Sequence, residues 1–157
     1  MTAGITEEQR LALSVDSKGF IPTSLYFGCG AGWYELVRAV GFYAGHHLNR
    51  WKEVNEIQTR LKANGTYNEK DHGWTAEYLT KNPIDPAIKT VAIQIKEKFG
   101  GLRLYYEGSD PYIDGLIAMA EATSFKTCEQ CGKEGKRRTK GGYIYTSCDE
   151  HSHGEEV

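Results

Sequence analysis

Residues 128–151 read CEQCGKEGKRRTKGGYIYTSCDEH and contain two pairs of residues that commonly bind metal ions. Two residues separate the partners in each pair, which are Cys128 with Cys131 and Cys148 with His151. A structural zinc site takes four such ligands in a tetrahedron, and two short pairs that each span a tight turn are the simplest way to supply them. The spacing therefore predicts a structural Zn2+ site in a C-terminal zinc knuckle, with Cys128, Cys131, Cys148 and His151 as ligands.

The same spacing bears on the fourth ligand and on the chemistry of the ion. His153 is an alternative to His151, but the two-residue gap after Cys148 favours His151. Four protein ligands leave no open position for a reactive water molecule, so the ion is predicted to hold structure and not to perform hydrolysis. Cys29 lies far from the other three cysteines, and the grouping of those three favours a metal over disulfides in a reducing compartment.

The segment before the knuckle has the pattern of a β-hairpin. Apolar and polar residues alternate over residues 91–98 (VAIQIKEK), which predicts a strand with one wet face. The glycines at 100 and 101 fit a two-residue turn, after which residues 102–108 return as a second strand. This turn would pair Glu97 with Leu104 and so place a carboxylate on the apolar face. The other residues predicted on that face of the first strand are Val91, Ile93 and Ile95.

Helical patterns occupy the N-terminal half. Thr6 and Gln9 resemble a capping box for a short helix over residues 7–15. The longest helical pattern runs over residues 33–65. In its second half, apolar residues at steps of three and four indicate a face turned to the core. They are Leu48, Trp51, Val54, Ile57 and Leu61.

Two more segments complete the outline. Residues 65–90 are polar and contain two X-Pro pairs, so they are predicted to be a connecting loop with at most a short helix at residues 74–79. Asp110 followed by Pro111 predicts the N-cap and the first position of another helix. The fold class is therefore α+β, with helices packed on a β-hairpin or small antiparallel sheet and a C-terminal zinc knuckle.

The length of the chain limits the number of domains, and its net charge limits the kinds of partner. A chain of 157 residues suits one domain, which we divide into an α+β core over residues 1–125 and a zinc-binding knuckle packed on it over residues 126–157. A formal net charge of -2 supplies no global field for nucleic acid or for an anionic membrane. No apolar stretch approaches the roughly 18–20 residues that span a bilayer, and the first residues lack the order of a secretory signal, so we expect a cytoplasmic location without membrane contact.

Two basic surfaces are candidates for binding phosphate groups. Between the two ligand pairs, five basic residues face one acidic residue, Glu134, and the candidate ligand-binding residues among the five are Lys136, Arg137, Arg138 and Lys140. The wet face of the hairpin adds Lys96, Lys98, Arg103 and Tyr105, which would combine charge pairing with stacking. The alternative for both surfaces is that they are solvated and serve only solubility.

Other residues do not form a coherent catalytic set. His46 and His47 are adjacent on the long helix and thus about 100° apart, which does not place both on one metal ion. His72 stands alone in a predicted loop, and Cys29 has no histidine or aspartate at a catalytic spacing. Residues 28–32 (GCGAG) look like a dinucleotide-binding loop, but no second parallel strand follows, so these glycines more simply allow a close backbone approach beside Trp33. Glu97 is an inward carboxylate with a raised pKa, a salt-bridge partner or, if a longer turn shifts the register, an outward residue, and a structural role is favoured over a catalytic one.

Four segments carry a resemblance to known sequences. GWYELVRAV (32–40), VAIQIKEKFGGLRLYYEG (91–108), TCEQCGKEG (127–135) and SCDEH (147–151) resemble a group of small uncharacterised proteins of phages and bacteria. Its members share a Gly-Trp helix, a hairpin of the KEKFGGLR type and a terminal CxxC…CxxH knuckle. The match covers roughly residues 30–151, with a longer insertion before the hairpin. The resemblance implies a phage or prophage context and no particular reaction.

Three hypotheses for function follow. The leading one is a non-enzymatic, zinc-stabilised binding protein of phage type, which sequesters or inhibits a host protein or a phosphate-bearing ligand in the host cytoplasm and so blunts host defence. The second is a nucleic-acid-binding regulator that uses the zinc loop. The third is a nuclease or nucleotide hydrolase that uses Glu97 with one or more histidines. The absence of a coherent catalytic set favours a protein that is not an enzyme.

Overall fold

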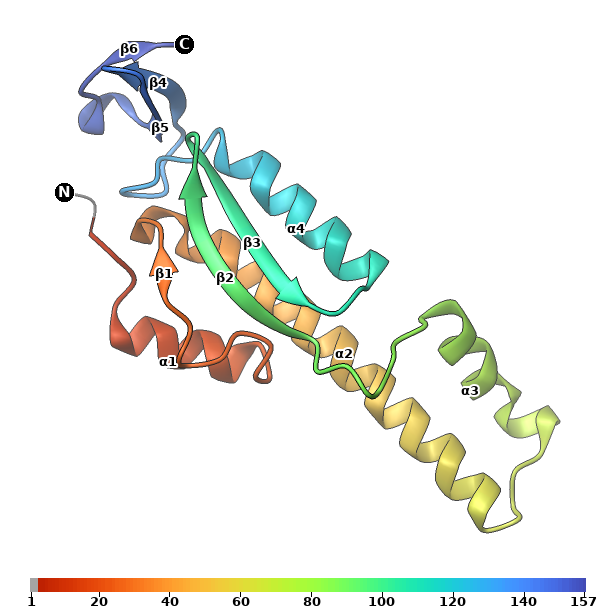
Figure 1. Cartoon of the computed structure of the whole chain (residues 1–157). Coiled ribbons are helices and arrows are strands. Elements are labelled where there is room, and N and C mark those ends of the chain that lie inside the picture. The colour runs from red at the N-terminus through yellow and green to blue at the C-terminus, as the bar shows by residue number, and fades with distance from the viewer. Residues whose placement is uncertain (1–2) are drawn as a thin grey trace.

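The computed structural model describes residues 3–157 and has the mixed α+β fold that the sequence predicts (Figure 1). Two small sheets with the strand orders β1-β2-β3 and β5-β4-β6 are combined with four α-helices in the described part of the chain. In chain order the elements are α1 (Glu7–Asp16), β1 (Phe27–Gly28), the 3-10 helix η1 (Ala31–Trp33), α2 (Tyr34–Ala63), α3 (Glu69–Lys81), β2 (Val91–Lys98), β3 (Gly101–Glu107), α4 (Pro111–Ser124), β4 (Lys136–Lys140), β5 (Tyr143–Ser147), η2 (Asp149–His151) and β6 (Glu155–Glu156).

The core lies between the first sheet and the helices that cover it. β1 pairs parallel with β2, and β2 pairs antiparallel with β3. Figure 1 shows α2 passing behind the hairpin, with α1 and α4 on either side. Apolar residues from all these elements form one buried cluster, which includes Leu13, Ile21, Trp33, Val37, Ile95, Leu102, Leu104, Ile113 and Ile117. Burial of this apolar surface is the main favourable contribution to folding.

Capping residues start the helices where the sequence predicts. The backbone N of Gln9 donates to Oγ1 of Thr6 and the backbone N of Thr6 donates to Oε1 of Gln9, which confirms the capping box of α1. Asp110 caps α4 and accepts from the backbone N of Tyr112 at 2.9 Å. Its other carboxylate oxygen lies 2.8 Å from Nε2 of His47, so a nearly buried His–Asp pair joins α2 to the start of α4.

The hairpin turn is displaced from the predicted position. Phe99 and Gly100 both have positive φ, 53° and 80°, and form the turn, whereas Gly101 already pairs with Lys98 in the ladder. The pairing predicted from a turn at 100 and 101 is therefore wrong by two residues. A shift of two preserves the face of every side chain, so Glu97 faces Leu102 instead of Leu104 and stays on the core side.

A bulge also changes the first half of β2. The register shifts between Ala92 and Gln94, and Ile93 projects outward with 56% of its surface exposed, while Ala92 takes the buried place. The strict alternation predicted for Val91, Ile93 and Ile95 fails for this reason. At the start of β3, Gly101 lies close enough to the ring of Phe125 that a Cβ would come within 2.6 Å of it. Gly100 therefore forms part of the turn, whereas Gly101 allows close packing against Phe125.

The segment predicted as a loop contains a full helix. α3 starts after Asn68, whose side chain accepts from the backbone N of Asp71 at 2.9 Å, and it continues for 13 residues. Together with the C-terminal half of α2 it forms an arm that extends beyond the sheet (Figure 1). Thr75 of α3 is fully buried and accepts a hydrogen bond from Gln58 of α2.

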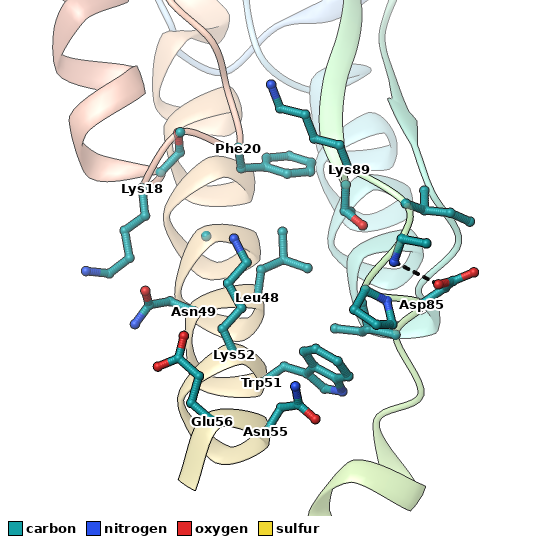
Figure 2. Close-up of a pocket in the computed structure, with 18 residues that line it drawn as sticks. Lys18, Phe20, Leu48, Asn49, Trp51, Lys52, Asn55, Glu56, Asp85 and Lys89 are labelled. Atoms are coloured by element: carbon teal, nitrogen blue, oxygen red, sulfur yellow. Dashed lines mark hydrogen bonds between the residues drawn. The ribbon is translucent and has the colours of Figure 1, made fainter. Parts of the chain in front are cut away.

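The residues of the predicted apolar stripe of α2 thus lie in two different environments. Val54 is fully buried where the arm begins. Leu48 and Trp51 line a cavity between α2 and the segment that leads into β2 (Figure 2).

The crossing of α1 and α2 depends on a glycine and yields a prediction about stability. Gly45 of α2 is buried against the backbone of Ser17, and a Cβ added to it would come within 3.0 Å of the Cα of Ser17 and closer to its carbonyl group. We expect Gly45→Ala to lower the free energy of unfolding by about 2–3 kcal/mol, because the two backbones must separate. Urea unfolding followed by circular dichroism measures this change.

Gly115 of α4 supplies the matched control. A Cβ at this exposed helical position meets no atom within 4 Å. Gly115→Ala should therefore raise the free energy of unfolding by about 0.5–1 kcal/mol, because alanine loses less conformational freedom in a helix. Equal effects of the two substitutions would contradict the proposed close approach at Gly45.

Candidate metal centre

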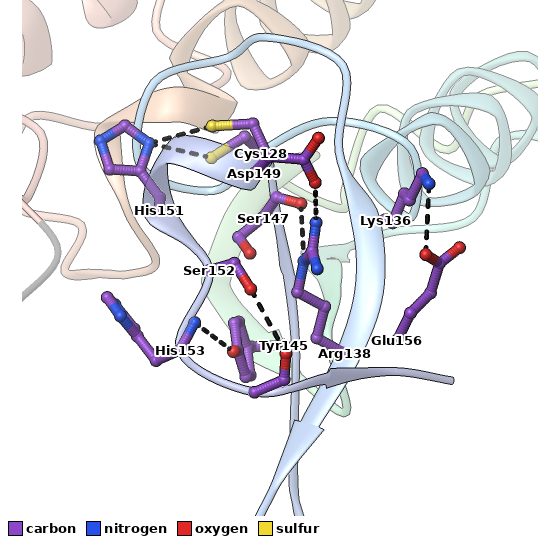
Figure 3. Close-up of polar contacts among 12 residues, drawn as sticks. Cys128, Lys136, Arg138, Tyr145, Ser147, Asp149, His151, Ser152, His153 and Glu156 are labelled. Atoms are coloured by element: carbon purple, nitrogen blue, oxygen red, sulfur yellow. Dashed lines mark hydrogen bonds and ion pairs between the residues drawn. The ribbon is translucent and has the colours of Figure 1, made fainter.

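The four predicted ligands lie together at the C-terminal end of the structure. The ligand atoms of Cys128, Cys131, Cys148 and His151 are all within 4.8 Å of one another. Sγ of Cys131 and Sγ of Cys148 are 3.7 Å apart. Nδ1 of His151 lies 3.6 Å from Sγ of Cys128 and 3.2 Å from Sγ of Cys148 (Figure 3). A tetrahedral zinc site places its sulfur and nitrogen ligands roughly 3.5–3.8 Å apart. The group could therefore hold one metal ion, with Nδ1 as the histidine ligand atom.

Tight turns bring each pair of ligands together. After Cys131, Gly132 adopts a φ of 78° and its backbone N donates to the carbonyl of Cys128 at 2.9 Å. The backbone N of Cys128 in turn donates to the carbonyl of Lys133 at 2.8 Å. The second pair spans η2, where the backbone N of His151 donates to the carbonyl of Cys148. The CEQCG segment thus folds back on itself as a metal-binding knuckle does.

The surroundings of Cys128 favour ionised sulfur, whereas the pKa of Cys131 is raised, because its hydrogen bond from the backbone of Lys133 is outweighed by burial and by the neighbouring thiols of Cys128 and Cys148. Burial opposes the ionisation of Cys128, but backbone N–H groups of Cys148, Cys131 and Gln130 point at its sulfur and lower the pKa to about 6. Cys29 is a contrast, because burial and the nearby Glu129 raise the pKa of its thiol to about 12. Cys29 therefore remains a protonated thiol that packs in the core, while the surroundings of Cys128 favour the thiolate form that binds metal ions.

The metal-binding unit is attached to the core through the GCGAGW segment. The backbone N of Gly32 donates to the carbonyl of Glu129 at 2.8 Å, and Nε1 of Trp33 donates to the carbonyl of Thr127 at 2.8 Å. The backbone N of Gly30 donates to the carboxylate of Glu129 at 2.9 Å. A Cβ on Gly32 would lie within 2.6 Å of the carbonyl of Glu129. The glycines beside Trp33 thus allow a close backbone approach, as predicted, and the segment that approaches them is the CEQC turn.

The hairpin tip provides a second attachment. Oγ1 of Thr146 donates to the carbonyl of Gly100 at 2.6 Å, and Nη2 of Arg137 donates to the carbonyl of Phe99 at 3.0 Å. Glu97 accepts from the backbone N of Gly100 at 2.7 Å and from the hydroxyl of Tyr143 at 3.2 Å. The inward carboxylate is therefore a structural acceptor between the hairpin and β5.

Most of the predicted basic loop is occupied by contacts within the protein. Arg138 is 7% exposed and pairs with Asp149, and Lys136 pairs with Glu156 at 3.2 Å (Figure 3). The guanidinium of Arg137 lies over the ring of Phe125 at 5.0 Å. Lys140 is exposed at the end of β4. These contacts join β4 to β6 and to the residues near the metal-binding group. Less positive charge is therefore available to an outside ligand than the sequence predicts.

The basic and aromatic residues predicted on the wet face of the hairpin lie closer to their expected arrangement than those of the basic loop. Lys96 and Arg103 pair across the strands, and Gln94 pairs with Tyr105 on the same outward face. Nζ of Lys96 lies 5.5 Å from the ring centre of Tyr105. Arg103 turns toward α4, where it lies 3.9 Å from Glu121 and stacks over Phe125. Lys98 is exposed beside the turn.

The histidines outside the metal-binding group have separate environments. The ring of His153 stacks near Tyr145 with centroids 6.3 Å apart. His46 bonds to the carbonyl of Phe42 and His47 pairs with Asp110, so the two do not share a site. His72 accepts from the backbone N of Asn68 beside the start of α3. Sequence reasoning missed the His47–Asp110 pair, although the role of Asp110 as an N-cap was recognised.

Comparisons of the chain with protein-family models, with curated proteins and with solved structures find no match. The protein is therefore described by its fold and its site, as an α+β protein with a C-terminal Cys3His group that could bind a metal ion. Among residues 3–157, no helix combines the length and apolar character required to cross a bilayer.

The metal-binding group predicts a stoichiometry that two matched pairs of variants can test. We expect about one Zn2+ per chain by mass spectrometry of the purified metalloprotein, and loss of that ion in Cys131→Ser and His151→Ala. Cys29→Ala and His153→Ala should keep the ion, since neither residue belongs to the group. Hydrogen exchange over residues 126–157 should become faster only in the metal-free variants. Retention of the ion in His151→Ala with loss in His153→Ala would reassign the fourth ligand.

Proposed function

We propose that this chain is a non-enzymatic binding protein of phage type, stabilised by structural zinc, which sequesters or inhibits a host protein or phosphate-bearing ligand in the host cytoplasm. The observation that carries the proposal is the closed Cys3His group, whose neighbours fasten the C-terminal segment to the hairpin tip. A site with four protein ligands favours structural use of the ion. Such an ion stiffens a surface that a partner can recognise, and an anti-defence role follows if that partner belongs to the host's defence.

Zinc is the metal that suits this ligand set best. Three thiols and one imidazole are soft or borderline ligands, which disfavour magnesium and calcium. A tetrahedral arrangement of sulfur and nitrogen ligands is typical of zinc. The separations of 3.2–3.7 Å between neighbouring ligand atoms support that geometry.

The surface that we propose for the partner surrounds the hairpin tip. We call it the hairpin surface and define it by Lys96, Lys98, Phe99 and Tyr105. Phe99 is 64% exposed and Tyr105 is 43% exposed. The backbone carbonyl of Phe99 accepts from Arg137 of the metal-binding unit at 3.0 Å. Exposed aromatic side chains on a rigid support are favourable anchors for protein partners. The adjacent ammonium groups add attraction for acidic or phosphorylated partners.

The alternatives have weaker support. A nucleic-acid-binding role would rely on the basic loop, but Lys136, Arg137 and Arg138 are already engaged inside the protein. A hydrolytic role would rely on Glu97, whose carboxylate is held between Gly100 and Tyr143. We therefore retain these roles as possible outcomes of the experiment below.

A capture experiment with matched charge variants tests the proposal. The immobilised, zinc-loaded protein should retain a specific protein from bacterial lysates, and Lys96→Ala/Lys98→Ala should retain about tenfold less of it because the charged part of the hairpin surface is gone. Lys62→Ala/Lys70→Ala removes the same charge from the distant arm and should retain as much as the wild type. Quantitative mass spectrometry measures the retained partner.

Three results would reject the proposal. One is equal retention by both double variants, or no reproducible partner at all. Another is retention of oligonucleotides with a steep dependence on salt, which would favour the nucleic-acid-binding role. The third is a nuclease or nucleotide-hydrolase turnover that disappears in Glu97→Gln while the fold survives, which would favour an enzyme.

A further inference from the structure

A second region of the protein has the form of a ligand site. A cavity of about 660 Å³ lies between α2, the turn that follows α1 and the segment that leads into β2. Three lysines from these separate segments line it, namely Lys18, Lys52 and Lys89. Figure 2 shows Lys18 and Lys89 on opposite sides, with Lys52 of α2 between them. The volume falls within the range of roughly 300–1,000 Å³ that is usual for small-molecule sites.

The wall of the cavity offers apolar and aromatic surface. Phe20, Leu48 and Trp51 line it (Figure 2). Trp51 is 8% exposed, and its ring also borders an adjoining hollow of about 500 Å³ on the far side of the segment that leads into β2. The indole Nε1 has no hydrogen-bond partner among the described residues. A buried donor without a partner costs free energy, so this tryptophan has unused capacity for an acceptor as well as a ring face for stacking.

The charges around the cavity favour an anion. None of the three lysines forms an ion pair with a residue in the range 3–157. Two carboxylates also line the cavity. Asp85 is already engaged, because its Oδ1 accepts from the backbone N of Ala87 at 2.9 Å, while Glu56 is exposed and suits a hydroxyl group as an acceptor. Three ammonium groups against two carboxylates leave a local excess of one positive charge.

The turn after α1 sets the position of Lys18. With a φ of 50°, Lys18 is one of two non-glycine residues in the described chain that adopt the left-handed conformation, and Gly19 follows with a φ of 83°. Both residues close the C-terminal end of α1, where the backbone N of Lys18 donates to the carbonyl of Val15 and that of Gly19 to the carbonyl of Ser14. The turn brings Lys18 to the cavity and places the next residue, Phe20, in its wall.

We propose that this cavity binds a nucleotide, with the phosphate near Lys18, Lys52 and Lys89 and the base against Leu48 and Trp51. Ammonium groups bind phosphate as point charges, and aromatic side chains provide stacking surfaces that tolerate different bases. The side chains of Asn49 and Asn55, which also line the cavity, have the donors and acceptors that a base or ribose requires. The inference deepens the proposed binding function by naming a ligand class, and it uses none of the residues of the hairpin surface.

Titration with nucleoside monophosphates tests the inference. Calorimetry with AMP, GMP, CMP and UMP should show saturable binding of at least one of them at one site per chain. Adenosine and inorganic phosphate serve as fragments and should each bind more weakly than AMP if AMP is the ligand. Lys52→Ala/Lys89→Ala should weaken binding about tenfold or more, because two charge-assisted contacts are lost. Lys62→Ala/Lys70→Ala, with the same change in net charge, should leave the affinity unchanged.

Fluorescence of the tryptophans locates the bound nucleotide. Binding should change the emission of the wild-type protein, and this change should be absent in Trp51→Phe, which retains Trp33 and Trp74. An emission change that persists in Trp51→Phe would place the ligand elsewhere and overturn the inference.

Further results would also overturn it, namely no saturable binding of any of the four nucleotides, equal weakening by the two lysine double variants, or phosphate bound as tightly as the nucleotides. These results would leave the proposed function intact if a partner is still captured through the hairpin surface. Conversely, nucleotide binding without any captured partner protein would retain the cavity site and reject the proposed function at the hairpin surface.

Discussion

The rest of the structure depends on the contact between the backbone of Gly32 and the backbone of the CEQC turn. The N–H of Gly32 donates to the carbonyl of Glu129, and the indole of Trp33 donates to the carbonyl of Thr127. Trp33 is fully buried in the core and immediately precedes α2. Two adjacent residues, Gly32 and Trp33, thus join the start of the longest helix to the group that could bind a metal. Only glycine fits at position 32, because a Cβ would occupy the space of the opposing peptide.

This contact matters because residues 126–157 have little apolar core of their own. The buried residues in that range are two cysteines, Gly135, Arg138, Thr146 and Ser147, and the apolar cluster of the protein ends with Ala120 of α4. A segment of about thirty residues with so little apolar burial does not offset the conformational entropy lost on folding. Metal coordination supplies that free energy in small domains, and here the ion pairs around β4 and the hydrogen bonds to the hairpin tip add to it.

Local chemistry made some elements predictable, whereas long-range packing decided the others. The paired spacing of Cys128, Cys131, Cys148 and His151, the capping box and the Asp110 cap depend on residues close in sequence. The prediction of the hairpin register was wrong because the turn could lie either at residues 99 and 100 or at residues 100 and 101. Packing of Gly101 against Phe125 decides between these two turns. α3 was missed because its buried face is defined by α2. Likewise, the hydrogen bonds that occupy the basic loop join residues far apart in sequence.

The two proposed binding regions are separate in space and are connected by β2. The hairpin tip lies beside the metal-binding unit, and the opposite end of the hairpin lies beside the segment that leads out of the arm (Figure 1). Lys89 and Thr90 line the cavity directly before β2 begins, and the backbone N of Ala92 donates to the carbonyl of Phe20 at 2.8 Å. The wall of the cavity is therefore hydrogen-bonded to the same strand that carries Lys96 and Lys98. Because β2 is paired on both sides, by β1 and by β3, it holds both regions in a fixed relation.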